Sequence, residues 1–191
     1  AHVNLRFFRV AAHQWRGKLQ AREQQQWAWQ KAGDFTVSPM LPANTALLAQ
    51  LAIPSAFSGS LKTGLLGSNA SGEYRVMPHT VAPHAMAETQ HEAVWMPLDA
   101  WQQRNRQPEN APSVWLAVDD AAQFRAAQAA DAIIWRVNDN AMAQALAEVL
   151  REGAAMPIVA AASADVVACW QDAWRANGVQ AVVCDNETGA A

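Results

Sequence analysis

From about residue 73 onward, short apolar runs alternate with longer segments of helical periodicity. The segments between the later runs predict helices at 121–130, 140–151 and 165–177. Strands that are apolar throughout and separated by single amphipathic helices are typical of parallel β/α units covered on both faces. This half of the chain is therefore predicted to have an α/β fold. The strands expected from the apolar runs are 73–77, 93–97, 114–118, 132–137, 157–161 and 179–184.

Short polar side chains stand where these helices begin, and such side chains can accept hydrogen bonds from the free N–H groups of a first turn. We expect Asp119-Asp120, Asn140 and Asp165 to act as these caps. Asp119-Asp120 also follows a strand directly, and barrel enzymes carry catalytic groups at the carboxyl ends of their strands. Of the two roles, capping is the one that we favour.

The first 54 residues follow a different pattern. Branched and aromatic residues predict strands at 3–11 and 27–30. The two prolines of the stretch 38–44 exclude a helix interior there, so this stretch is predicted to be a loop. A helix is expected over 45–52, and Asn44 or Thr45 can cap it.

Residues 55–72 are rich in glycine and serine, which is typical of a linker or a loosely held surface loop. We therefore predict two domains joined by this linker. The division is 1–54 for the first domain, 55–72 for the linker, 73–186 for the second domain and 187–191 for a tail.

Composition narrows the class of protein. The chain has 191 residues, of which 51% are hydrophobic and 16% charged, so it is apolar enough to bury a core and too apolar to be disordered. A net charge of −3 argues against direct nucleic-acid binding as the main function. Nine tryptophans are present, and we favour packing over a stacking platform as their role.

No apolar run approaches the roughly 20 residues of a membrane span, so no membrane partner is expected. The two cysteines, Cys169 and Cys184, lie in apolar surroundings and give no disulfide framework. A cytoplasmic location is therefore predicted. The chain begins at Ala1 without methionine and directly in strand-like sequence, which suggests a segment of a longer protein.

The first 54 residues resemble the C-terminal part of the MutT-type Nudix hydrolases, the 8-oxo-dGTP diphosphatases. The resemblance rests on a strand, a W-x-G turn, an R-E-x-Q segment, an aromatic strand and a P-A-N loop in this order and at this spacing. These are His2-Val3-Asn4-Leu5-Arg6-Phe7-Phe8, Trp15-Arg16-Gly17-Lys18, Ala21-Arg22-Glu23-Gln24-Gln25-Gln26-Trp27-Ala28-Trp29 and Leu41-Pro42-Ala43-Asn44.

This resemblance implies a Mg²⁺-dependent pyrophosphohydrolase that cuts a nucleoside triphosphate substrate to a monophosphate and pyrophosphate. Glu23 falls where the family places a carboxylate near the catalytic metal, where it could support the metal or help to activate water. Asn44 falls where the family's asparagine reads the purine edge, because an amide can donate and accept at once. Without the resemblance, Glu23 would be read as a solvated charge and Asn44 as a helix cap.

One essential part of the family pattern is missing. The Nudix box, G-x5-E-x7-R-E-x-x-E-E-x-G, occurs nowhere in the chain, and its helix supplies most of the metal-binding carboxylates of the family. In the family, the box precedes the strand matched by residues 3–11. We therefore expect only a partial Nudix α/β/α domain, which is inactive alone.

The second domain resembles, more faintly, the thiamine-phosphate-synthase-like domain that is fused behind MutT-type domains in some bacterial proteins. True synthases present a glycine pair to a phosphate at the strand ends of a barrel, whereas this chain has Ala160-Ala161-Ala162-Ser163. A shortened, degenerate parallel β/α-barrel-like domain without catalytic activity is therefore implied. The matching segments are Tyr74-Arg75-Val76-Met77-Pro78, Ala93-Val94-Trp95-Met96-Pro97, Trp115-Leu116-Ala117-Val118-Asp119-Asp120-Ala121-Ala122-Gln123, Ala130-Asp131-Ala132-Ile133-Ile134 and Met156-Pro157-Ile158-Val159-Ala160.

Three other hypotheses stay open. The second domain could be a binding module for a phosphate-bearing small molecule or a protein partner, or an active thiazole-phosphate coupling enzyme, against which the Ala160–Ser163 stretch argues. A metal cluster is also conceivable, although it lacks the H-E-x-x-H order, and a solvated helix face is the favoured interpretation. Its members would be His79, His84, Glu88, His91 and Glu92.

Overall fold

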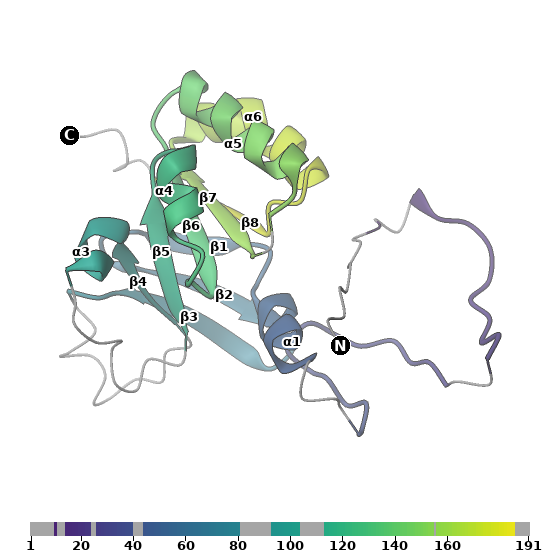
Figure 1. Cartoon of the computed structure of the whole chain (residues 1–191). Coiled ribbons are helices and arrows are strands. Elements are labelled where there is room, and N and C mark those ends of the chain that lie inside the picture. The colour runs from purple at the N-terminus through teal and green to yellow at the C-terminus, as the bar shows by residue number, and fades with distance from the viewer. Residues whose placement is uncertain are drawn as a thin grey trace.

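The described part of the chain is built around one eight-stranded sheet whose strands follow each other in sequence order (Figure 1). The computed structural model describes residues 10, 14–23, 26–39, 44–80, 93–103, 113–154 and 156–185. Strands β1 to β3 are antiparallel neighbours, and β3 to β8 run parallel. The strands are β1 Phe57–Ser60, β2 Gly64–Asn69, β3 Gly72–Pro78, β4 Ala93–Pro97, β5 Val114–Val118, β6 Ala132–Val137, β7 Ile158–Ala162 and β8 Ala181–Cys184.

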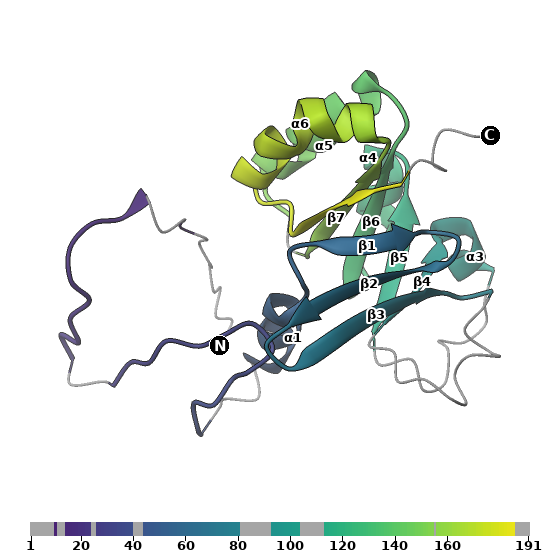
Figure 2. The same ribbon diagram turned by 180° about the vertical axis from the view of Figure 1, so that it is seen from behind.

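The sheet curves into a nearly closed barrel. The first and last strands lie beside each other, and Ala56 forms a parallel bridge with Val182. The backbone N–H of Leu61, just after β1, donates to the carboxylate of Asp185, just after β8. Figure 2 shows β1, β2 and β3 on the near side, with α4, α5 and α6 above them. The helices are α1 Thr45–Ala52, α3 Leu98–Gln102, α4 Ala121–Ala126, α5 Asn140–Glu152 and α6 Ala164–Ala176.

Two buried clusters hold the fold together, one on each side of the parallel strands. Because successive strand residues point to opposite faces, β5 sends Trp115 to the inner cluster and Leu116 to the outer one. The inner cluster fills the barrel and includes Tyr74, Trp95 and Ile134. The outer cluster packs the sheet against α3 to α6. All five residues of β5 and of β7 are therefore buried, which confirms the predicted α/β class with covered parallel strands.

The stretch 55–72 is not a loose linker, and this prediction is wrong at the level of secondary structure. It forms β1, β2 and the start of β3. Its glycines are required by geometry: Gly59 has φ +97°, and a Cβ there would overlap the carbonyl oxygen of Gly64 on the partner strand. A Cβ at Gly67 would lie 2.8 Å from Pro54 and 2.9 Å from Phe57. The small residues therefore permit close packing rather than chain flexibility.

The strands and helices predicted after residue 72 are confirmed in position, with changes at their ends. Helix α4 stops at Ala126 rather than at residue 130, and the short helix α3 was not anticipated. Asp120 does cap α4, since its carboxylate accepts from the N–H of Gln123. The other two caps are shifted by one or two residues: Asp139 caps α5 in place of Asn140, and Ser163 precedes α6 in place of Asp165.

The N-terminal part differs more from expectation. The predicted helix after the loop is confirmed as α1, but residues 27–30 do not form a strand, and an isolated bridge between Lys31 and Asp34 stands near them. The predicted strand 3–11 lies, apart from Val10, outside the described residues. The Nudix-type half of the fold therefore stays a prediction.

The packing role predicted for tryptophan is confirmed in the barrel and not in the N-terminal part. Trp95, Trp115, Trp135 and Trp174 are buried. Three N-terminal tryptophans, at positions 15, 27 and 29, are exposed, and the ring of Trp29 contacts both others, tilted against Trp15 at a centroid distance of 6.5 Å and edge to face with Trp27 at 6.2 Å. Both cysteines are exposed, so the apolar surroundings expected for them are not found. Within the described ranges, no helix has the length and apolar character that crossing a membrane requires.

Candidate functional site

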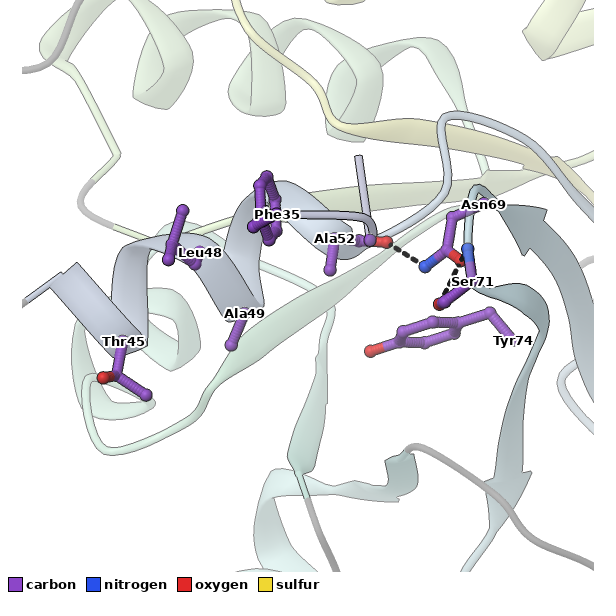
Figure 3. A pocket seen from close by; sticks show the side chains of 9 residues that line it. Phe35, Thr45, Leu48, Ala49, Ala52, Asn69, Ser71 and Tyr74 are labelled. Atoms are coloured by element: carbon purple, nitrogen blue, oxygen red, sulfur yellow. Dashed lines mark hydrogen bonds between the residues drawn. The ribbon is translucent and has the colours of Figure 1, made fainter. Parts of the chain in front are cut away.

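A pocket of about 390 Å³ opens beside α1, between that helix, the turn around Gly33 and the hairpin that joins β2 to β3 (Figure 3). This volume lies within the range of small-molecule sites. One face of α1, with residues spaced three or four apart, forms one wall. The lining residues are Gly33, Phe35, Thr45, Leu48, Ala49, Ala52, Asn69, Ser71 and Tyr74.

Asn69 fixes the three walls of this pocket relative to one another. Its Nδ2 donates to the carbonyl oxygen of Ala52 at 2.7 Å, which ties the end of α1 to the hairpin. Its Oδ1 accepts from the backbone N–H and the hydroxyl of Ser71, at 2.9 and 2.6 Å. A Cβ at Gly33 would lie 2.6 Å from the Asn69 amide, so only glycine allows the turn to approach this closely.

The pocket wall combines apolar surface with hydroxyl groups. Phe35, Leu48 and the alanines of α1 supply the apolar part, while Thr45, Ser71 and Tyr74 carry hydroxyls. No charged side chain belongs to the nine residues that line it. Such a lining suits a flat ring with polar atoms at its edge.

Tyr74 is the pocket residue that the barrel core holds by aromatic packing. It is buried, and its ring contacts Trp115 and Phe57 with centroids 6.2 Å away from each. Figure 3 shows its hydroxyl directed along the side of α1 that carries Ala49 and Thr45. The barrel core therefore holds an aromatic ring in one orientation at the pocket wall.

Asn44 directly precedes the helix that forms one wall of this pocket, but it is not one of the nine lining residues. It occupies the N-cap position of α1 and is half-buried, and the next residue, Thr45, lines the pocket. Its side chain makes no capping hydrogen bond, so the predicted capping role is wrong. The position of Asn44 is compatible with its base-reading role, which stays a prediction.

Glu23 lies elsewhere. It is exposed, in a segment that forms neither helix nor strand, and it does not line the pocket. Its roles in metal binding and catalysis stay predictions. Among the residues that the structure describes, no three His, Cys, Asp or Glu side chains are grouped so that they could hold a metal ion. Of the imagined histidine cluster, His79 is described, and His84, Glu88, His91 and Glu92 lie outside the described residues.

A second cavity of about 430 Å³ shares Asn69 with the first and is lined by residues at and just after the end of α1. Lys31 lines it together with Leu51, Ile53 and Gln180. The Gln180 amide donates to the carbonyl oxygen of Ile53 at 2.6 Å, which anchors the chain leaving α1 to β8. The α1 region is thus held against the barrel from two sides.

The carboxyl ends of the parallel strands carry a separate polar group, the ion pair between Asp119 and Arg136. Both residues continue the inward-facing positions of their strands, β5 and β6. Nε and Nη2 of Arg136 donate to the two carboxylate oxygens of Asp119 at 2.7 and 2.5 Å. Both side chains are about one-third exposed, at 32% and 33%.

Three other carboxylates at this end have structural roles. Asp120 and Asp139 cap helices, and Asp185 binds the N–H of Leu61. Residues Ala160–Ala162 of β7 are fully buried, and no glycine pair opens a phosphate cradle there. This arrangement is compatible with the non-catalytic barrel that the sequence predicts.

Sequence reasoning missed the pocket, because residues from three segments far apart in the chain form it. Phe35, Asn69 and Tyr74 are each unremarkable in their own segment. The run Asn69-Ala70-Ser71-Gly72 was the usable signal, since Asn, Ser and Gly between two apolar runs are typical of a hairpin turn. For the Asp119–Arg136 ion pair, the usable signal was Arg136 itself, a charged residue inside an otherwise apolar strand.

Comparison of the chain with protein-family models, curated proteins and solved structures gives no match.

Proposed function

We propose that this chain is part of a pyrophosphohydrolase of oxidised nucleoside triphosphates, which converts 8-oxo-dGTP to 8-oxo-dGMP and pyrophosphate in a reducing cytoplasm. The support from sequence is the resemblance of residues 1–54 to the MutT-type family. The support from geometry is one observation: Asn44 begins the helix whose side lines a pocket of about 390 Å³ with aromatic and hydroxyl groups.

In this proposal the chain contributes base recognition. The Asn44 amide carries both a donor and an acceptor, and oxidised guanine presents both kinds of group on its edge. A site that pairs each polar atom of the correct base leaves polar groups unpaired when another base binds, and this unpaired state is what disfavours the wrong base.

Mg²⁺ would neutralise phosphate charge and activate the attacking water. The described residues do not fit a magnesium site, because no three His, Cys, Asp or Glu side chains are grouped among them and Glu23 is exposed. The resemblance assigns the metal to the Nudix box, which this chain does not contain. We therefore assign no step of phosphate cleavage to its residues, and we expect the chain alone to be inactive.

Binding of 8-oxo-dGMP tests the proposal without requiring catalysis. Titration calorimetry should give tighter binding of 8-oxo-dGMP than of dGMP, and Asn44→Ala should remove this preference. Asn177→Ala is the matched control, because Asn177 is an exposed asparagine at the end of α6. An unchanged preference in Asn44→Ala would reject the role of Asn44.

A second candidate function is a non-catalytic binding module for a phosphate-bearing small molecule or a protein partner, through the barrel. The observation that favours it is the partly exposed Asp119–Arg136 pair at the carboxyl ends of the strands. An arginine held through two of its nitrogens is oriented in advance, which suits recognition of phosphate oxygens.

A further inference from the structure

The barrel contributes a full wall to the pocket beside α1. Three of the nine lining residues, Asn69, Ser71 and Tyr74, belong to the β2–β3 hairpin and strand β3. The remaining six come from the turn around Gly33 and from α1. A molecule in this pocket would therefore touch both the segment that carries Asn44 and the barrel.

The contacts between these walls are specific. The backbone N–H of Ala70, at the tip of the hairpin, donates to the carbonyl oxygen of Ala32 at 2.9 Å. Asn69 reaches the last residue of α1, Ala52, from the same hairpin. Hydrogen bonds therefore join the hairpin both to the Gly33 turn and to α1, so the barrel residues keep a fixed position at the pocket.

We infer that the barrel takes part in choosing the base: the purine ring occupies the pocket beside α1, and Tyr74 is a specificity-determining residue for it. This inference rests on the proposed nucleotide function and adds the barrel to the recognition site. Oxidised guanine fits the lining by its chemistry. It is a flat aromatic ring with donors and acceptors on its edge, and the wall offers Phe35, Leu48 and hydroxyl groups without a charge.

Tyr74 is the barrel residue best placed for this role. Its ring is fixed by Trp115 and Phe57, so little side-chain entropy is lost when a ligand docks against it. Its hydroxyl group is directed along the pocket wall formed by α1 (Figure 3). A phenol can both donate and accept a hydrogen bond, which suits the edge of a purine.

Filling the pocket tests where the base binds. Ala49 is exposed on the pocket-lining face of α1, so Ala49→Phe puts a ring into the cavity without disturbing a buried core. We expect the affinity of the chain for 8-oxo-dGMP to fall about tenfold or more. Ala122→Phe, at an exposed position of α4, is the matched control and should bind as the unmodified chain does. Equal binding by Ala49→Phe and Ala122→Phe would overturn the inference.

Removing one hydroxyl tests the role of the barrel. Tyr74→Phe keeps the buried ring, and it should weaken 8-oxo-dGMP binding about two- to tenfold, as expected for one hydrogen bond, while binding of dGMP changes less. Thr63→Ala removes a hydroxyl from the turn at the opposite end of the hairpin strands and should have no effect. Circular dichroism confirms that each variant is folded.

The outcomes separate the two proposals. If Asn44→Ala removes the preference for 8-oxo-dGMP while Tyr74→Phe leaves both affinities unchanged, the inference about the barrel is wrong and the proposed function stands. If the unmodified chain binds neither nucleotide, the proposed function fails, and the inference fails with it. If Tyr74→Phe and Ala49→Phe both weaken binding relative to their controls, the barrel is part of the base site.

Discussion

The carboxylate of Asp185 accepts a hydrogen bond from the backbone N–H of Leu61 at 2.9 Å, across 124 positions of sequence. Asp185 follows the last strand, and Leu61 follows the first, so this bond joins the two edges of the sheet. Asp185 is 2% exposed, and water therefore does not compete for the bond. Together with the bridge between Ala56 and Val182, it closes the barrel between its edge strands, β1 and β8.

Asp185→Ala should destabilise the barrel by about 1–3 kcal/mol, because the buried N–H of Leu61 loses its acceptor. Urea denaturation followed by tryptophan fluorescence measures the free energy of unfolding. Asp172→Ala, at an exposed position of α6, is the control and should change it little. Equal stability of the two variants would show that the contact between β1 and β8 does not depend on this bond.

Trp115→Ala should cost about 3–5 kcal/mol, because Trp115 is fully buried in the inner cluster and its removal leaves a large cavity. The same change releases Tyr74, whose ring packs against it. Trp29→Ala is the matched control, since this tryptophan is 72% exposed. Denaturation curves of similar midpoint for the two variants would contradict the described core.

Gly59→Ala should destabilise the protein by about 1–3 kcal/mol more than Gly153→Ala does. Both glycines have positive φ, +97° and +90°, so both substitutions incur similar backbone strain. They differ in their surroundings: a Cβ at Gly59 would overlap the backbone of β2, while nothing lies within 4 Å of a Cβ at Gly153. Thermal unfolding of the two variants measures the difference. If residues 55–72 were a flexible linker, Gly59→Ala would destabilise the protein no more than Gly153→Ala does.

The parallel part of the fold could be predicted because its signals are local. Strands such as β5 and β7 are continuous apolar runs, and Gly153 and Gly178 follow the ends of α5 and α6 with positive φ, a local signal of helix termination. The antiparallel hairpin could not be predicted in the same way. The Gly and Ser content of residues 55–72 is also what a linker has, and the steric need for Gly59 is visible only once β2 lies beside it and brings the carbonyl oxygen of Gly64 close.

The candidate sites divide in the same way. Residues within one local motif could be found from the sequence, and residues that meet only in the folded chain could not. Asn44 is a candidate from a local motif, and the structure places it at the N-cap of α1, next to the pocket-lining residue Thr45. Tyr74 and Phe35 were not found, because they come together only through the contact of Ala70 with Ala32. For Asp119-Asp120 the sequence allows a helix cap or a functional position at the strand end. In the structure Asp120 caps α4, and Asp119 pairs with Arg136.

If the barrel is a binding module for phosphate-bearing molecules, titration calorimetry of the whole chain with thiamine phosphate should give a measurable heat. Arg136→Gln should weaken this binding, because it removes the positive charge at the carboxyl ends of the strands and keeps a polar side chain there. Arg75→Gln is the matched control. Arg75 is also paired with a carboxylate, that of Glu73 at 2.7 Å, but it lies on strand β3 away from the inner cluster.

The affinity in this experiment should be modest and should fall as salt is added. Asp119 already neutralises much of the charge of Arg136, and the carboxylates of Asp120, Asp139 and Asp185 follow strands β5, β6 and β8 at the same end of the sheet. A phosphate would thus bind through the oriented guanidinium rather than through a strongly positive surface, and screening weakens such exposed contacts. No heat with the unmodified chain, or an equal loss in Arg136→Gln and Arg75→Gln, would exclude the carboxyl end of the barrel as the phosphate site.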